Sequence, residues 1–174
     1  PDIFRIKEII MKRKACFFLI LVLCLMPALL LKSYALDAAP DFSLNDLNNG
    51  SVSLSQFKGK GPVILFFWTT WCPFCRDQLD LLKDKYSRLK QDGIEVMVID
   101  VGERKAKVES FVKGRNFPFS VLLDQSTGVA KNYKVYGVPT YIFIDKSGNI
   151  ILKENKFPDY KTVFGIQSSS KDGQ

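Results

Sequence analysis

Apolar runs of strand length alternate along the middle of this chain with segments whose apolar residues recur at helical spacing. The run at 63–68, Val-Ile-Leu-Phe-Phe-Trp, is uninterrupted, which is typical of a strand buried on both faces of a sheet. In the segment 73–91 an apolar residue recurs every three or four positions, which predicts a helix with one buried stripe. The stripe consists of Cys75, Leu79, Leu82, Tyr86 and Leu89.

The rest of the chain continues this alternation of strands and helices. The further predicted elements are a strand at 94–101, a helix near 104–114, a strand at 119–123, a short helix at 126–132, strands at 140–145 and 149–154, and a short helix at 159–166. The last two strands are joined by Lys146-Ser147-Gly148, a tight connection that predicts an antiparallel pair.

A hairpin is predicted ahead of these elements. Short strand-like segments at 42–44 and 52–54 are joined through Asn48-Asn49-Gly50. Together the pattern predicts an α/β fold in which a mixed sheet is flanked by helices, with an N-terminal β-hairpin extension.

The first 35 residues follow a different pattern. A basic segment at 11–14 precedes an apolar run of 17 residues at 15–31, and Ser33-Tyr34-Ala35 then offers small residues for a signal peptidase. We expect residues 1–35 to be an N-terminal extension with a signal peptide of an exported protein. A membrane anchor that stays uncleaved is the alternative, since about 20 apolar residues are needed to span a bilayer. The expected domain occupies 36–166, and 167–174 is expected to be a disordered tail.

The composition narrows the possible chemistry. The formal charge is +7, but the first 35 residues hold six basic residues against two acidic ones, so no basic surface for nucleic acid is predicted. The chain has no histidine, which excludes catalysis by a Ser-His-Asp or Cys-His pair. Of the four cysteines, Cys16 and Cys24 lie in the expected signal, which leaves one pair in the expected domain.

That pair, Cys72 and Cys75, is the candidate redox centre. Pro73 follows the first thiol where the predicted helix begins, so Cys72 lies at a strand-to-helix junction where free N–H groups favour the thiolate. We expect Cys72 to attack from an exposed end and the buried Cys75 to resolve the mixed disulfide. A structural disulfide would close too short a loop to stabilise the fold much, and a metal site would lack ligands.

Several motifs resemble a known family. They are Phe-Trp-Thr-Thr-Trp-Cys-Pro-Phe-Cys at 67–75, Leu-Ser-Gln-Phe-Lys-Gly-Lys at 54–60, Tyr-Gly-Val-Pro-Thr at 136–140 and Phe-Ile-Asp-Lys-Ser-Gly at 143–148. The chain resembles the thioredoxin-like superfamily, specifically the exported TlpA/ResA type of thiol-disulfide oxidoreductase, over about residues 40–154.

The resemblance implies a substrate-binding surface around the cysteines. Its expected members are Trp71, Pro73, Phe74, Val138, Pro139 and Thr140. Pro139 would follow a cis peptide bond and face the Cys72 sulfur, and the backbone of Val138 would pair with an extended substrate segment. Trp71 would shield the cysteine pair, whereas Trp68 is expected in the core.

Two positions depart from the family pattern. Phe66 stands where thioredoxin has a buried aspartate, and Gln78 stands where ResA-type proteins have a glutamate. A carboxylate there could take the proton of the resolving thiol, so we expect this step to use water or another residue.

The resemblance also implies partners. Protein disulfides or dithiols would be the substrates, with apocytochrome c thiols one class among them, and a membrane electron donor would supply a reductant working in an oxidising compartment. No metal or cofactor is expected beyond the Cys72–Cys75 disulfide itself. The dipeptide between the cysteines has no histidine or charge, which argues against a strongly oxidising couple.

Four alternatives remain open. A disulfide-forming oxidant would use the same cysteines in the opposite direction. A peroxidase of the peroxiredoxin kind would need Pro-x-x-x-Thr-x-x-Cys, and here Thr69 fits but Leu65 replaces the proline. A copper-delivery protein would need C-x-x-x-C and a histidine, and both requirements fail here. A thioredoxin-like binding module without catalysis is the fourth.

Overall fold

The computed structural model describes residues 37–167. Within this range the elements follow in the order β1 (Ser43–Asn45), β2 (Ser51–Ser53), η1 (Leu54–Phe57), β3 (Val63–Trp68), α2 (Pro73–Gln91), β4 (Glu95–Val101), α3 (Lys105–Val112), β5 (Val121–Asp124), α4 (Gly128–Asn132), β6 (Thr140–Ile144), β7 (Ile150–Glu154) and α5 (Tyr160–Phe164). The signal or anchor predicted within 1–35, and the predicted tail beyond Gln167, lie outside the described residues.

Five strands form the main sheet in the order β5-β4-β3-β6-β7, with β3 at its centre. β4 runs parallel to β3 and β5 parallel to β4, whereas β6 is antiparallel to β3 and β7 antiparallel to β6. The pairing of β6 with β7 shifts register between Phe143 and Ile144. β1 and β2 form the antiparallel hairpin predicted ahead of the main fold. The mixed sheet and its hairpin extension therefore confirm the predicted fold class.

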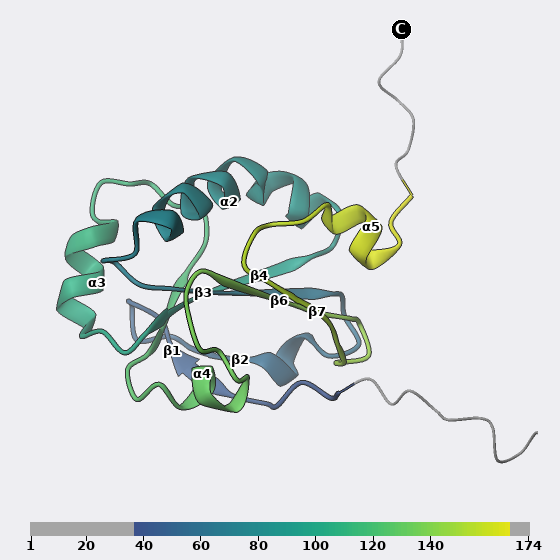
Figure 1. The fold of residues 1–174 in the computed structure, drawn as a ribbon, viewed down its shortest axis with the longest axis horizontal. Coiled ribbons are helices and arrows are strands. Elements are labelled where there is room, and N and C mark those ends of the chain that lie inside the picture. The colour runs from purple at the N-terminus through teal and green to yellow at the C-terminus, as the bar shows by residue number, and fades with distance from the viewer. Residues whose placement is uncertain (1–36, 168–174) are drawn as a thin grey trace, which may run out of the picture. The chain divides into compact units, whose positions relative to one another are not determined.

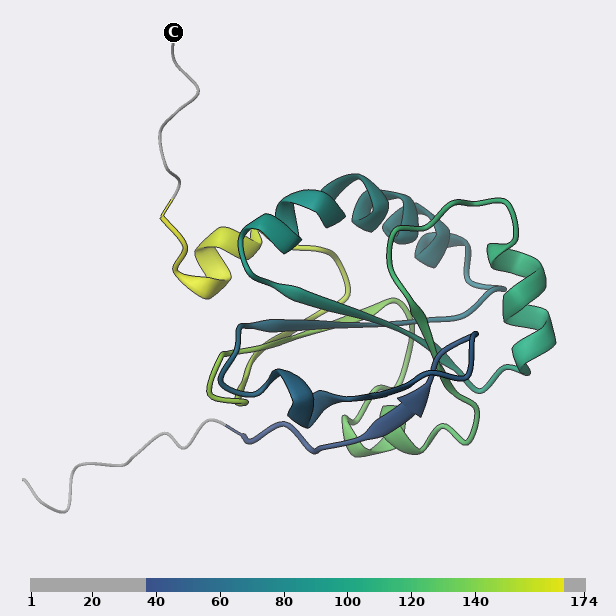
Figure 2. The same ribbon diagram turned by 180° about the vertical axis from the view of Figure 1, so that it is seen from behind.

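Helices cover both faces of the sheet (Figure 1). α2 and α5 lie over one face, while α4, η1 and the β1–β2 hairpin lie over the other, and the view from behind shows the same layers (Figure 2). An isolated bridge between Asp46 and Leu122 connects the hairpin to β5.

The central strand explains this arrangement, because its alternate residues point into two separate cores. Ile64, Phe66 and Trp68 belong to the core under α2. Val63, Leu65 and Phe67 belong to the core on the other face. All six side chains are buried, as the uninterrupted apolar run predicted, and each such burial stabilises the fold by roughly 1.5–3 kcal/mol.

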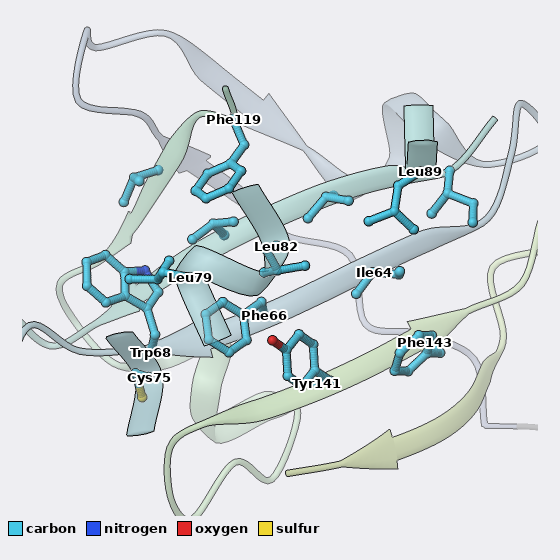
Figure 3. Close-up of a cluster of buried hydrophobic side chains, with 14 of the residues drawn as sticks. Ile64, Phe66, Trp68, Cys75, Leu79, Leu82, Leu89, Phe119, Tyr141 and Phe143 are labelled. Carbon is cyan, nitrogen blue, oxygen red and sulfur yellow. The ribbon is translucent and has the colours of Figure 1, made fainter. Parts of the chain in front are cut away.

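Helix α2 packs its predicted stripe against the first core, as Figure 3 shows for Leu79, Leu82 and Leu89. Tyr86, the remaining large member of the stripe, is only partly buried at the edge of this core. The helix ends before Gly93, whose φ of +74° gives the left-handed turn expected of a helix stop.

The shorter elements differ from their predicted bounds by a few residues at their ends. The helix predicted at 126–132 begins at Gly128, because Thr127 adopts a left-handed conformation with φ of +60°. The last helix begins only after Asp159, whose side chain accepts a hydrogen bond from the N–H of Lys161 as an N-cap. Leu54 begins a 3-10 helix instead of ending the second strand of the hairpin.

Candidate active site

Cys72 occupies the N-cap of α2, at the predicted junction between strand and helix. Its backbone is extended, with φ −84° and ψ 109°, and Pro73 follows at the first helical position, where a missing N–H leaves no hydrogen bond unmade. The Cys72 Sγ accepts a hydrogen bond from the backbone N–H of Cys75 at 3.1 Å. The helix start thus directs a donor and its positive dipole end at this sulfur, which stabilises a thiolate there.

Cys75 lies one turn into α2, on the buried face of the helix, and forms a disulfide with Cys72 across a Cα–Cα distance of 5.3 Å. Its side chain is fully buried, as predicted, and belongs to the same core as Trp68 (Figure 3). The expectation of an exposed Cys72 is wrong for this oxidised form, because the residue is only 3% exposed. The carbonyl oxygen of Val138 lies 3.7 Å from the Cys72 Sγ and contributes to this burial.

The segment before β6 faces the disulfide, although it is 66 residues away in the sequence. The peptide bond between Val138 and Pro139 is cis, and both residues are partly buried. Thr140 is buried and donates its Oγ1 hydrogen to the carbonyl oxygen of Gly137 at 2.7 Å. Asn155, just beyond β7, donates from Nδ2 to the carbonyl oxygen of Pro139 at 2.8 Å. Two side chains therefore brace the loop that carries the cis bond.

Exposed apolar side chains surround this pair of segments. Trp71 is 64% exposed, Phe74 is 74% exposed and Tyr136 is 93% exposed. Trp71 and Phe74 flank the two cysteines in sequence, and Tyr136 lies two residues before Val138. The structure thus leaves three large apolar side chains exposed to water in the segments that carry the disulfide and the cis bond.

A groove of about 430 Å³ adjoins this surface. α2 contributes Phe74 and Leu81 to its lining, the cis loop contributes Pro139, and the segment after β7 contributes Lys156 and Phe157. The groove therefore lies between α2 and the cis loop.

The two positions that depart from the family pattern are connected beneath α2. Phe66 stacks on Tyr141 of β6 with ring centroids 4.5 Å apart. The hydroxyl of Tyr141 donates to the Gln78 Oε1 at 3.1 Å, and burial raises the pKa of Tyr141. Neither replacement leaves a buried polar group unpaired, and none of the three side chains ionises near neutral pH.

Two other carboxyl groups, those of Asp100 and Glu103, lie at and just beyond the end of β4. Asp100 is 1% exposed and pairs with Trp68 in the register of β3 and β4. Burial raises the pKa of Asp100 to about 8, and the adjacent side chain of Glu103 adds to this effect. Asp100 therefore carries a proton at neutral pH.

Glu103 is 7% exposed and is held as an anion. Its carboxylate accepts hydrogen bonds from the Thr70 N–H at 2.6 Å and the Thr70 hydroxyl at 2.9 Å, and Lys107 contacts it at 2.5 Å. Burial alone would raise the pKa of Glu103, but hydrogen bonds from Lys107, Thr70 and Asp100 hold it below its ordinary value.

Sequence reasoning missed these two acids. Asp100 interrupts an otherwise apolar run, which is a weak signal of a buried polar role. Glu103 is 33 residues from Thr70, and their contact depends on the pairing of β3 with β4. Within residues 37–167 no group of three or more His, Cys, Asp or Glu side chains is arranged to hold a metal ion. None of the helices among these residues has the length and apolar character that crossing a membrane requires.

A central strand that leads into Cys-x-x-C at a helix start, with a Val-Pro-Thr loop opposite, defines the thioredoxin-like class of proteins. A family model described as the AhpC/TSA family matches residues 35–153, which is more than half of the chain. The chain belongs to this family.

Individual relatives agree with this assignment. The thiol-disulfide oxidoreductase ResA of Bacillus subtilis is 37% identical over 131 residues, which cover 72% of this chain and 73% of that protein. ResA of Bacillus thuringiensis subsp. konkukian is 37% identical over 113 residues, so the match spans just under two thirds of its length, 65%. The thioredoxin domain of a thiol-disulfide oxidoreductase from Bacteroides vulgatus has a similar structure, with a TM-score of 0.65, 30% identity and coverage of 75% of this chain and 96% of that one.

Proposed function

We propose that this chain is a thiol-disulfide oxidoreductase in which Cys72 is the nucleophile and Cys75 the resolving thiol. The observation that carries the proposal is the Cys72–Cys75 disulfide at the start of α2, with the Cys72 Sγ facing the Val138 carbonyl and accepting from the Cys75 N–H. The relatives named ResA and the family match support the same class of activity.

In the reducing direction the exchange takes two steps. The Cys72 thiolate attacks one sulfur of a substrate disulfide, which forms a mixed disulfide and releases the other substrate sulfur as a thiolate. Cys75 then loses its proton and attacks the Cys72 sulfur, which closes the Cys72–Cys75 disulfide and releases the second substrate thiolate. The substrate gains two electrons, and an external dithiol must return two electrons to the cysteine pair.

The substrates we propose are extended segments of proteins that carry a disulfide or a dithiol. Trp71, Phe74 and Tyr136 offer exposed apolar surface, and a groove lies between Phe74 of α2 and Pro139 of the cis loop. Trp71, Pro73, Phe74, Val138, Pro139 and Thr140 are proposed as the substrate-binding residues. Thr140 is buried, so we assign it to bracing the loop and not to direct contact.

The direction of electron flow is proposed to be reduction, because neither residue between the cysteines adds a charge that would stabilise the thiolate further. We also propose that the protein is exported and works in the periplasm or on the outer side of a membrane, where a membrane protein donates electrons. Apocytochrome c is proposed as one substrate, alongside other exported proteins. Support for export comes from the basic and apolar pattern of residues 11–31.

A trapping experiment tests the assignment of the two cysteines. The Cys75→Ser variant should retain mixed disulfides with a disulfide-bonded test peptide, detected by mass spectrometry, whereas Cys72→Ser should retain none and lose exchange. If Cys72→Ser still exchanges disulfides, the assignment of the nucleophile is wrong.

Equilibration of the wild-type chain with glutathione buffers tests the direction. A reduction potential near or below about −220 mV supports a reductant, and one near about −120 mV makes the protein an oxidant.

A peroxidase of the peroxiredoxin kind is the nearest alternative, but this site departs from the Pro-x-x-x-Thr-x-x-Cys pattern. Leu65, at the place of the required proline, is buried within β3 and pairs with Met97 and Ile142 on its two neighbouring strands. We expect no peroxide consumption by the reduced chain, and turnover of hydrogen peroxide at a rate comparable to disulfide exchange would contradict this expectation.

A further inference from the structure

The loop between β3 and α2 is held by a carboxylate from outside the cysteine motif. Thr70 lies two residues before Cys72 and is 6% exposed. Its N–H and its hydroxyl both donate to Glu103, and its carbonyl accepts from Arg76 of α2 at 3.1 Å. Every polar group of Thr70 is therefore used, and two of its three hydrogen bonds end on one side chain.

Glu103 is an anion in a buried site, so its position depends on the charges of the groups around it. Lys107 reaches it from α3, and Asp100 lies against it from β4. One oxygen of Asp100, Oδ2, has no hydrogen-bond partner and is buried. A neutral Asp100 leaves one anion and one lysine at this place, which is a balanced arrangement for a buried site.

We propose that Glu103 is a positioning residue for the Cys-x-x-C loop, and that Asp100 must keep its proton for Glu103 to hold Thr70 in place. This inference rests on the proposed function, since it concerns the loop that carries the nucleophile. It assigns a part in the exchange reaction to two residues that never touch substrate.

The surroundings of Asp100 define what its ionisation would do. β3 contributes Trp68, which does not titrate, and Lys107 of α3 is the cation that acts on the two acids. Arg76 of α2 donates to the carbonyl oxygen of Thr70. Asp124 of the neighbouring strand β5 accepts from the Ala130 N–H of α4, in the core on the opposite face of the sheet. It therefore does not share the site.

Loss of the proton from Asp100 would place two carboxylates side by side in a buried site. Their repulsion is relieved when Glu103 moves outward, and this movement breaks both of its hydrogen bonds to Thr70. Trp71 and Cys72 follow Thr70 in the chain, so the loop over the disulfide loosens. Because the pKa of Asp100 is raised to about 8, the change falls just above neutral pH.

The Thr70 amide offers a direct test by NMR on the oxidised full chain between pH 6 and pH 10. In the wild type we expect its proton shift and its protection from exchange to change with a midpoint near pH 8. The Asp100→Asn variant should abolish this transition, because asparagine mimics the protonated acid in shape and can donate to Glu103. Asp124→Asn is the matched control, because Asp124 is equally buried at 1% exposure. In this variant the Thr70 amide should show the same transition as in the wild type. A Thr70 transition that persists in Asp100→Asn overturns the proposal.

A kinetic readout connects the loop to the chemistry. The rate of disulfide reduction by dithiothreitol is measured for each chain, and the ratio to wild type at each pH removes the ionisation of the reagent. We expect the ratio of the reduction rate of Asp100→Asn to that of the wild type to fall at least threefold between pH 7 and pH 9.5. In the wild type the loosened loop uncovers the Cys72 sulfur, in a residue that is otherwise 3% exposed, and in the variant the loop stays in place. A ratio that stays flat, or that moves the other way, contradicts the coupling.

Glu103→Gln provides a second route to the same answer. It keeps an acceptor oxygen for Thr70 but removes the charge that repels ionised Asp100, so the transition near pH 8 should also disappear. If it fails to fold, Asp100→Asn carries the test alone. If the wild-type chain exchanges no disulfide at any pH, the proposed function fails, while the Thr70 titration still decides the positioning role.

Discussion

Replacing Asp100 by asparagine should stabilise the fold increasingly as the pH rises from 5 to 8. The folded chain keeps a proton on Asp100 up to about pH 8, whereas the unfolded chain releases it near the ordinary value of 3.8. Between these values the native state binds the extra proton, so the contribution of this group to stability is complete below about pH 4 and is lost as the pH rises toward 8. Asparagine carries no such proton and escapes this loss.

The magnitude follows from the width of that window. One pKa unit corresponds to about 1.4 kcal/mol, so three pH units between 5 and 8 give a ceiling of about 4 kcal/mol. Local relaxation reduces such penalties in real proteins, and we expect roughly half of the ceiling, about 2 kcal/mol. This is a large share of the total stability of a domain, which is about 5–15 kcal/mol.

Urea unfolding followed by circular dichroism at pH 5, 6, 7 and 8 measures the effect. The free energy of unfolding of Asp100→Asn, minus that of the wild type, should grow with pH at an unchanged m-value. Asp124→Asn is the control for replacing a buried acid, and the effect assigned to Asp100 is the growth with pH that Asp124→Asn does not share. A difference for Asp100→Asn that is constant from pH 5 to pH 8 would refute the reasoning.

Three further predictions concern the surroundings of the disulfide. Tyr141→Phe removes the hydrogen bond to Gln78 and should cost about 1 kcal/mol in urea unfolding, by the same amount at pH 5 and pH 8; a pH-dependent cost would mean that this pair carries a charge. Leu82→Ala opens a cavity under α2 and should cost about 2–5 kcal/mol while the reduction potential stays unchanged. Asn155→Ala removes the hydrogen bond to the Pro139 carbonyl oxygen. Exchange with a disulfide-bonded peptide should therefore slow severalfold, while reduction of the chain by dithiothreitol should keep its rate. Equal slowing of both reactions would assign Asn155 a general structural role.

The part of the fold that follows from local patterns could be predicted from the sequence. The apolar run 63–68 and the stripe on 73–91 depend only on neighbouring residues, and both elements appear at the predicted bounds. The ends of the short helices could not be predicted so well, because a single backbone conformation such as that of Thr127 decides where they begin.

Some features of the site also follow from local sequence patterns, whereas others depend on contacts between distant segments. The position of Cys72 at a helix start follows from Pro73 and the strand before it, and the structure confirms it. The burial of Cys72 depends on the loop around Val138, far away in sequence, so the expectation of an exposed sulfur was wrong. The contact of Glu103 with Thr70 likewise depends on strand register, which no local pattern reveals.

The outer edge of the sheet bears on how the protein meets other chains. β7 lies at the edge of the main sheet, where the N–H of Ile150 at its start donates to the carbonyl oxygen of Asp37. The part of such an edge strand that lies beyond this contact could template strand addition and aggregation. The register shift opposite Phe143 and Ile144 bends this edge, and Lys153 extends from β7 to donate to the carbonyl oxygens of Tyr133 and Lys134. A bent edge that carries a lysine disfavours pairing with a foreign strand. We therefore expect other chains to contact this protein through side chains elsewhere on its surface and not by pairing with the backbone of β7.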